Sequence, residues 1–158
     1  MLDLLLIHPG NRLSPIYQSF SSELAAIEPP LWAALSAAFV RKHGYSVMIL
    51  DAEADELSAI EIADKTKELN PRLIAIPIYG HHPSASTQMM PAVRLVCDAL
   101  KRMLPSTPIL LFGGHAAALP EKTLKEERAD FVSGGEGFCT LIDLLVQLCA
   151  GNTNFISV

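Results

Sequence analysis

Residues 109–115 read Ile-Leu-Leu-Phe-Gly-Gly-His, a short apolar run that stops at two glycines and a histidine. A run without polar alternation, bounded by turn residues, is typical of a strand covered on both faces of a parallel sheet. Four other segments have the same β-type character. The five predicted strands are Leu2–His8, Ser46–Asp51, Leu73–Ile78, Ile109–Phe112 and Phe131–Ser133.

Longer stretches with helical spacing separate these strands. In the first, apolar residues recur every three or four positions from Leu31 to Phe39, and Gly44 supplies a stop. In the second, Ser58 and Glu61 have the spacing of a capping box at the start of a helix. This second helix is predicted over Ser58–Leu69. The remaining predicted helices are about Met89–Leu104, a short helix from Pro120, and Thr140–Leu148.

The alternation of strands and helices predicts an α/β fold. We expect a doubly wound five-stranded parallel sheet of the Rossmann-like kind, with the flavodoxin-like strand order 2-1-3-4-5 and helices on both faces. Residues 1–150 are expected to form this domain, and residues 151–158, which lack a helical pattern, to begin a linker. The loop from Pro9 to Glu28 is longer than an ordinary connector, which is typical of a functional or disordered segment.

The composition fits this fold and excludes several classes of protein and partner. Half of the 158 residues are hydrophobic and only 18% are charged, which excludes intrinsic disorder. No clean apolar stretch reaches the roughly 18 residues that a membrane span needs. The net charge of −5 argues against nucleic acid or an anionic membrane as a partner. The three cysteines lie in helical patterns and are expected to be buried free thiols in a reducing cytoplasm.

The ends of the predicted strands carry the candidate site, because ligands of open parallel sheets bind beyond the carboxyl ends of the strands. Four of the five histidines lie on this edge, and six of the nine glycines follow strands three, four and five. Glycine there lets a ligand approach the backbone closely. The segments concerned are His8-Pro9-Gly10-Asn11, Tyr79-Gly80-His81-His82-Pro83, Gly113-Gly114-His115-Ala116-Ala117 and Gly134-Gly135-Glu136-Gly137.

Individual residues on this edge have structural explanations as well. Glu136 either contacts the ligand or complements the positive end of the last helix. His81 and His82 are two adjacent imidazoles in a loop, so they are candidates for metal ligation as well as surface residues. Trp32, at the start of the first helix, is expected in the core or in a pocket wall.

Several enzyme motifs are missing from the sequence. It has no P-loop, its first strand does not open into Gly-x-Gly-x-x-Gly, and no serine stands in Gly-x-Ser-x-Gly. A phosphoacceptor receiver domain needs carboxylates after strands one and three, where this chain has His8-Pro9 and Ile78-Tyr79. Nucleotide hydrolysis, dinucleotide binding, phosphoacceptor signalling and serine hydrolysis are therefore set aside.

Segments spread along the chain resemble one known family. They are Pro29-Pro30-Leu31 at a helix start, Arg41–Val47 followed by Ile49-Leu50-Asp51-Ala52-Glu53, the stretch Leu111–Leu124 with its glycine pair, histidine and Pro-Glu, and the turn Asp130–Gly137. Together they resemble the N-terminal cobalamin-binding domain of cobalamin-dependent radical SAM enzymes, over roughly Leu2 to Leu148.

This resemblance implies a corrinoid lying across the strand-end edge, with its nucleotide tail beside the glycine loops. The implied cofactor contacts are Pro9, Tyr79, Gly80, His81, Gly113, Gly114, His115, Ala116, Gly135, Glu136 and Gly137, and the candidate cobalt ligands are His81 and His82. The Asp-x-His-x-x-Gly motif that supplies the cobalt ligand in mutases is absent after the first strand. The cobalt ligand therefore stays open.

The resemblance also implies a partner domain. The sequence has no Cys-x-x-x-Cys-x-x-Cys motif, so S-adenosylmethionine and a [4Fe–4S] cluster are expected in a radical SAM domain of the same polypeptide, after the linker. The complete protein is then expected to be a methyltransferase or a related radical enzyme, while this domain alone binds the cofactor without turnover. Two alternatives remain, a cofactor-free domain for protein association or regulation, and a flavodoxin-like binder of a smaller ligand.

Overall fold

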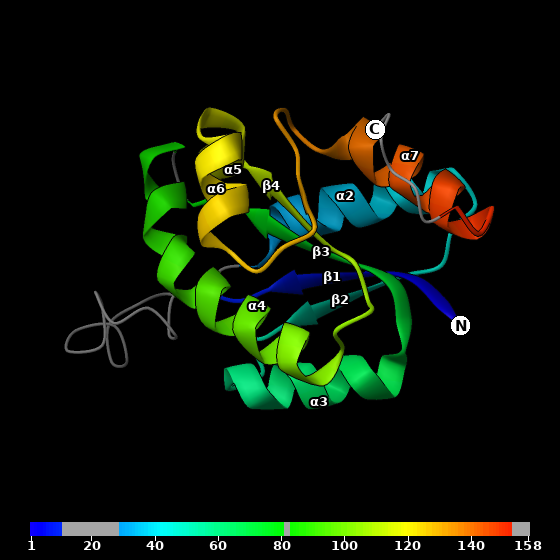
Figure 1. The fold of residues 1–158 in the computed structure, drawn as a ribbon, viewed down its shortest axis with the longest axis horizontal. Helices are drawn as coiled ribbons and strands as arrows, with labels where there is room; N and C mark the ends of the chain where they lie inside the picture. The colour runs from blue at the N-terminus through cyan, green and yellow to red at the C-terminus, as the bar shows by residue number, and fades with distance from the viewer. Residues whose placement is uncertain (11–28, 81–82, 153–158) are drawn as a thin grey trace.

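Five parallel strands form one sheet in the order β2-β1-β3-β4-β5, as predicted (Figure 1). The computed structural model describes residues 1–10, 29–80 and 83–152. Most of the predicted Pro9–Glu28 loop, His81, His82 and most of the predicted linker lie outside the described residues. The strands are β1 (Leu2–His8), β2 (Val47–Asp51), β3 (Pro71–Ile78), β4 (Ile109–Gly113) and β5 (Phe131–Val132).

Helices connect every pair of successive strands. They are α2 (Leu31–Lys42), α3 (Ala59–Leu69), α4 (Met90–Met103), α5 (Gly114–Ala118), α6 (Pro120–Glu126) and α7 (Phe138–Cys149), and the 3₁₀-helix η1 (Pro83–Met89) precedes α4. Among the described residues, no helix is long and apolar enough to cross a membrane.

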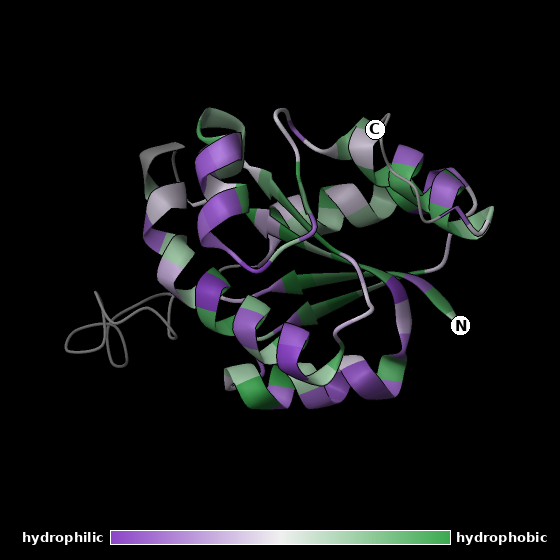
Figure 2. Cartoon of the chain, viewed as in Figure 1, coloured by the Kyte–Doolittle hydropathy of each residue, from purple (hydrophilic) through white to green (hydrophobic). Residues whose placement is uncertain are grey.

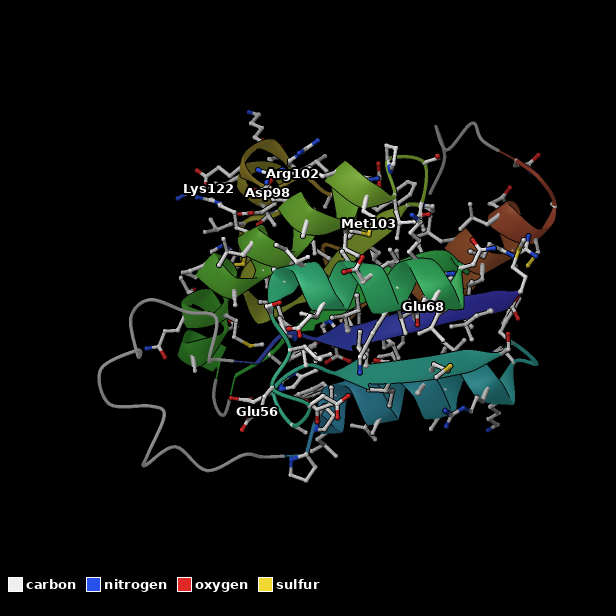
Figure 3. The ribbon with its side chains drawn as sticks, turned by 90° about the horizontal axis from the view of Figure 1, so that it is seen from below. Glu56, Glu68, Asp98, Arg102, Met103 and Lys122 are labelled. Atoms are coloured by element: carbon white, nitrogen blue, oxygen red, sulfur yellow. The ribbon has the colours of Figure 1, made fainter. Side chains whose placement is uncertain are left out.

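The central strands are buried on both faces, and their side chains alternate between two apolar layers. Ile74, Ile76 and Ile78 of β3 pack in the layer under α3 and α4, whereas Leu73 and Ala75 pack in the layer under α2 and α7. Figure 2 shows the strands in the hydrophobic colour between helices that are polar outward. Figure 3 shows α3 and α4 lying side by side across one face of the sheet. This arrangement confirms a doubly wound sheet.

Local sequence signals account for the helix ends. The capping box is present at α3, because the Ser58 hydroxyl accepts a hydrogen bond from the Glu61 backbone N–H and the Glu61 carboxylate accepts one from the Ser58 backbone N–H. Asn70 ends α3 in the left-handed conformation, with φ of 46°. Gly44 follows α2 with φ of 89°, a conformation that glycine adopts without strain.

Three features differ from the sequence predictions. The segment Gly114–Ala118, expected as a loop, is the short helix α5, and η1 was not predicted. Each of these helices has only one or two turns, so the apolar residues in its sequence cannot repeat often enough to reveal a helix. The prediction of buried cysteines holds for Cys97 and is wrong for Cys139 and Cys149, which are exposed near the two ends of α7. The apolar face of α7 is formed instead by Leu141, Leu144 and Leu145.

An ion pair fastens α4 to the segment that joins α6 to β5. The Arg94 guanidinium donates to both carboxylate oxygens of Glu127, at 2.7 and 3.2 Å. The Glu127 side chain is only 1% exposed, whereas that of Arg94 is 53% exposed. This bidentate contact raises the pKa of Arg94 above its ordinary value. Seven positions further along α4, Lys101 pairs with Asp130, just before β5, at 2.6 Å.

Removal of the Glu127 carboxylate should destabilise the fold. We expect Glu127→Ala to lower the free energy of unfolding by about 2 kcal/mol, because two charge-assisted hydrogen bonds in a buried position are lost. Glu126→Ala is the matched control. Its carboxylate is 49% exposed and lies 3.8 Å from Arg94, so the expected loss is below about 0.5 kcal/mol. Urea denaturation of both variants measures this difference, and equal losses would contradict the assigned role of Glu127.

Candidate functional site

The carboxyl ends of all five strands meet at one edge, because every strand pair is parallel. In Figure 1 this edge lies where the arrowheads point, next to η1, α5 and the turn between β5 and α7. The structure describes ten of the predicted contacts, and all but the buried Ala116 lie at this edge: Pro9, Tyr79, Gly80, Gly113, Gly114, His115, Gly135, Glu136 and Gly137. His81 and His82 lie outside the described residues.

At the β1 and β2 end of this edge, an imidazole faces a carboxylate. His8 Nε2 lies 3.5 Å from Glu53 Oε2, and the two side chains are 16% and 10% exposed. Gly10 packs directly on Glu53, since a Cβ atom on Gly10 would lie 2.4 Å from Glu53 Cβ. Gly10 also has φ of 68°. Glu53 was not among the predicted site residues, although the pairing of His8 with Asp51 in neighbouring strands brings the two segments together.

Tyr79, at the end of β3, connects three other elements across the edge. Its ring stacks on Trp32 of α2 with the ring centroids 4.1 Å apart and the planes 14° from parallel. It also meets the Phe112 ring of β4 edge to face, with 6.3 Å between centroids. The Tyr79 hydroxyl donates to the Glu136 carbonyl over 3.4 Å. Burial, followed by the charge of Glu136, raises the pKa of Tyr79.

Three of the predicted glycines are required by the packing of the chain itself. A Cβ atom on Gly80 would lie 2.4 Å from Ala85 Cβ, and one on Gly113 would lie 2.4 Å from the Ile78 carbonyl oxygen. A Cβ atom on Gly137 would lie 2.5 Å from the Phe112 ring. Gly113 and Gly137 also have φ of 121° and 84°. These glycines shape the edge whether or not a ligand is bound.

Gly134 and Gly135 behave differently. Both are exposed, neither has a left-handed φ, and a Cβ atom on either would have nothing within 4 Å. The Ser133 side chain holds this turn in place. Its hydroxyl accepts a hydrogen bond from the Gly135 backbone N–H at 3.3 Å and lies 3.2 Å from the Thr140 hydroxyl. We call residues 134–135 the open glycine turn. Ser133 was not predicted as a site residue, and it lies just before the glycines that the sequence singled out.

Helix α7 begins directly after this turn. Its first residue is Phe138, its N-cap is Gly137, and no side chain caps it. The first N–H groups of a helix lack partners within the helix and carry a partial positive charge, so they favour an anionic or hydrogen-bond-accepting ligand. The open glycine turn therefore offers bare backbone beside an uncapped helix of 12 residues.

The start of α5 completes the edge. His115 Nδ1 lies 3.0 Å from the Thr87 hydroxyl of η1. Burial, followed by the charge of Lys122, lowers the pKa of His115 and favours its neutral form. The Ala116 side chain is fully buried in the core and lies behind the edge, in contrast to its predicted neighbours.

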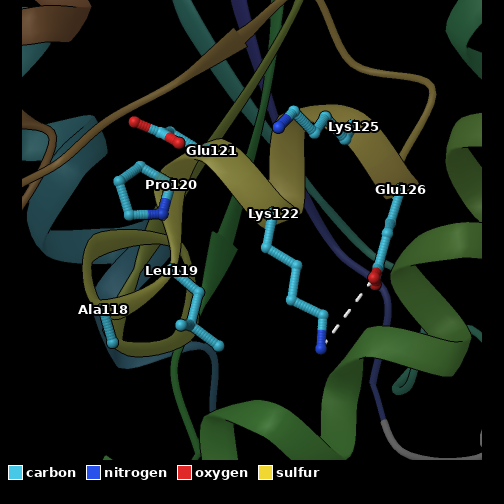
Figure 4. A pocket seen from close by; sticks show the side chains of 7 residues that line it. All are labelled: Ala118, Leu119, Pro120, Glu121, Lys122, Lys125 and Glu126. Carbon is cyan, nitrogen blue, oxygen red and sulfur yellow. Dashed lines mark ion pairs between the residues drawn. The ribbon is translucent and has the colours of Figure 1, made fainter.

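A shallow pocket of about 530 Å³ lies at the corner between α5 and α6 (Figure 4). Its lining combines Ala118, Leu119 and Pro120 with charged residues of α6, among which Lys122 pairs with Glu126 at 3.8 Å. None of the predicted site residues lines this pocket. Among the described residues, no group of three or more His, Cys, Asp or Glu side chains gathers in a way that could hold a metal ion.

Comparison with known proteins indicates the family to which the chain belongs. The model of the B12 binding domain family matches residues 20–145. The chain is 29% identical over 143 residues to the anaerobic magnesium-protoporphyrin IX monomethyl ester cyclase of Cereibacter sphaeroides, covering 87% of this chain and 22% of that protein. It is 28% identical over 140 residues to an uncharacterized methyltransferase of Pyrococcus horikoshii, covering 88% of this chain and 29% of that protein.

The fold also matches a solved structure. TsrM, a radical S-adenosylmethionine methyltransferase from Kitasatospora setae with cobalamin and a [4Fe–4S] cluster bound, superposes with a TM-score of 0.73 at 15% identity. The match covers 98% of this chain and 26% of TsrM, and at this identity it shows the fold. The chain thus spans less than a third of the length of these relatives. With the family model matched over most of its length, the chain belongs to the B12 binding domain family, as its sequence motifs indicated.

Proposed function

We propose that this chain holds cobalamin along the strand-end edge, as the corrinoid-binding domain of a larger radical SAM enzyme. The observation that carries the proposal is the open glycine turn beside the uncapped start of α7. Bound there, cobalamin would supply a cobalt centre that can carry a methyl group. The chain's own residues supply the shape of the edge, hydrogen-bonding backbone and shielding from water.

The open glycine turn fits the nucleotide tail of a corrinoid. The packing of the chain does not demand glycine at 134 and 135, so the small residues leave space for something outside the chain. A phosphate-bearing tail passing over this turn would meet backbone N–H groups and the positive end of α7 without steric hindrance. Gly135, Glu136 and Gly137 therefore remain our proposed tail contacts, joined by Gly134.

The other edge residues divide into two groups. Gly80 and Gly113 act by letting the end of β3 approach η1 and β4 closely, which places the edge, and Gly137, besides its proposed tail contact, lets α7 approach β4. Pro9, Tyr79, Gly114 and His115 line the edge where the macrocycle would lie, and the largely neutral His115 suits an uncharged amide of the corrin ring as its partner. His81 and His82 remain proposed cobalt ligands. Their substitution by alanine should shift the visible bands of bound cobalamin if either imidazole ligates the cobalt.

The radical chemistry would belong to another domain. Cys139 and Cys149 are ten positions apart on α7, which is about 15 Å along a helix, too far for one cluster. Cys97 is buried. We therefore place S-adenosylmethionine and a [4Fe–4S] cluster in a radical SAM domain joined after residue 150, with residues 151–158 as the start of the linker. The three free thiols suit a cytoplasmic protein.

A cofactor-free association domain is the second candidate. Leu31 and Leu35 lie on one face of α2 and are 62% and 45% exposed, an apolar strip that the described residues leave uncovered. Such a strip suits contact with another domain or protein. It is compatible with cobalamin binding as well, so cofactor retention is the measurement that separates the two candidates.

Cobalamin retention tests the proposal directly. Mixed with hydroxocobalamin and desalted, the chain should keep the corrinoid absorption bands. Gly135→Val should lower the affinity at least about tenfold, because its side chain fills the space above the turn, and each factor of ten is about 1.4 kcal/mol. Ala150→Val, at the exposed far end of α7, should bind like the unmodified chain. Absence of corrinoid bands in the unmodified chain would favour the association domain.

The two kinds of glycine should also differ in stability. We expect Gly137→Ala to lower the free energy of unfolding by about 2 kcal/mol or more, because an alanine at φ of 84° is strained and its Cβ would meet the Phe112 ring. Gly134→Ala should leave the stability within about 1 kcal/mol, since the space is open. Thermal unfolding of the cofactor-free chain measures both. A large loss for Gly134→Ala would mean that the turn serves packing instead.

The reading frame after codon 158 tests whether the chain is part of a larger radical SAM enzyme. Sequencing the gene beyond codon 158 should show a continuing frame with a Cys-x-x-x-Cys-x-x-Cys motif. A stop codon at that point would contradict the radical SAM assignment and leave the cobalamin-binding assignment to the retention measurement.

A further inference from the structure

A side-chain contact joins η1 to the start of α5 at the strand-end edge. His115 Nδ1 lies 3.0 Å from the Thr87 hydroxyl oxygen, which is hydrogen-bond distance. The contact connects the segments that follow β3 and β4. Either the hydroxyl or the imidazole can supply the proton, so the bond has two possible directions. The direction decides which ring nitrogen of His115 carries the hydrogen atom.

The surroundings of Thr87 favour one of these directions. In α3 and α6, the hydroxyls of Thr66 and Thr123 each donate to the carbonyl oxygen four positions back, at 2.7 and 2.8 Å, which is a common acceptor for a threonine in a helix. Thr87 differs from them. Within the part of the chain that the structure describes, its hydroxyl has no partner except His115 Nδ1. The hydroxyl proton is therefore satisfied within the chain only when Thr87 donates to Nδ1.

The charge state of the imidazole agrees with this direction, since only a neutral imidazole has a ring nitrogen that can accept. Burial, followed by the charge of Lys122, lowers the pKa of His115, and the opposing charges of Glu127 and Glu126 have smaller effects. The pKa thus lies below its ordinary value of 6.5, and the ring is mostly neutral at neutral pH. A neutral ring that accepts at Nδ1 carries its hydrogen atom on Nε2.

The Nε2 atom of His115 remains open to a ligand. It has no hydrogen-bond partner among the described residues. It is not enclosed either, because Arg72 Nε is the only buried side-chain nitrogen or oxygen without a partner in the same part of the chain. An Nε2–H group needs an acceptor. The carbonyl oxygens of the amide side chains around a corrin ring are acceptors of this kind.

We propose that Thr87 is a positioning residue: by donating to Nδ1 it fixes His115 in the Nε2–H tautomer, which presents an N–H donor to a carbonyl oxygen of the bound corrinoid. For the identity of the ligand, this inference rests on the proposed function. Thr87 acts through His115. Without the Thr87 hydroxyl, His115 would populate both tautomers, and the Nδ1–H form would turn a lone pair toward the carbonyl oxygen.

The tautomer of His115 can be measured in the cofactor-free chain. In ¹⁵N-labelled protein, a ring nitrogen that carries hydrogen and one that carries a lone pair give separate nuclear magnetic resonance signals. At about pH 8, above the ordinary pKa of histidine, we expect a single tautomer with hydrogen on Nε2. Thr87→Val keeps the shape of the side chain without the hydroxyl and should show both tautomers, and Thr87→Ser should restore the single form. Hydrogen on Nδ1 in the unmodified chain would overturn the proposal.

Cobalamin affinity tests the link from Thr87 to the ligand. By equilibrium dialysis with hydroxocobalamin, we expect Thr87→Val to bind about fivefold more weakly, the effect of weakening one neutral hydrogen bond. Thr87→Ser should bind like the unmodified chain. Thr66→Val is the matched control, because it makes the same change in the last turn of α3, which leads back to the start of β3. It should alter neither the affinity nor the tautomer.

Removal of the imidazole shows whether Thr87 acts through it. In a His115→Ala background there is no ring to orient, so the further change Thr87→Val should alter the cobalamin affinity by less than about twofold. If Thr87→Val weakens binding equally with histidine and with alanine at position 115, Thr87 acts independently of His115 and the positioning role is wrong.

The outcomes separate this proposal from the proposed function. If Thr87→Val changes the tautomer but leaves the cobalamin affinity unchanged, the positioning role is overturned and cobalamin binding stands. If the unmodified chain binds no cobalamin, the proposed function fails, and the positioning role fails with it.

Discussion

Burial of the central strands on both faces is the constraint on which the rest of this structure depends. In β3, the side chains from Leu73 to Ile78 are buried and alternate between two apolar layers. A strand with no polar face has to be covered by helices on both sides. Since each helix carries the chain back across the sheet, the strands run parallel and all their carboxyl ends reach one edge. The position of the site follows from this burial.

The glycines at the edge show how packing and ligand binding share one set of residues. Gly113 lies against the β3 backbone and Gly137 against the Phe112 ring, so each is fixed by a neighbour within the chain. Gly134 and Gly135 have no such neighbour. In the sequence the four glycines look alike. Only the space around each Cβ position distinguishes a glycine that closes the fold from one that leaves room for a ligand.

The sequence predicted the fold better than the contacts at the site. Apolar runs bounded by turn residues located all five strands to within a few residues, because a strand that is buried on both faces consists mostly of apolar residues. The helix α5 has five residues and leaves no such period. The exposure of Cys139 and Cys149 depends on which face of α7 turns inward, which the leucines decide. The contact of Trp32 with Tyr79 joins residues that are 47 positions apart, and it arises only when α2 packs over the end of β3.

Tyr79 and Gly137 hold the same turn by different contacts. The hydroxyl bond to Glu136 and the packing of Gly137 on Phe112 both hold the turn before α7 in place. A turn that is fixed presents its backbone to a ligand without losing further conformational freedom on binding, which favours affinity. The bond of the Tyr79 hydroxyl is long, at 3.4 Å, and exposed, whereas Gly137 is buried against the Phe112 ring, so the part of the turn next to α7 is the more firmly anchored.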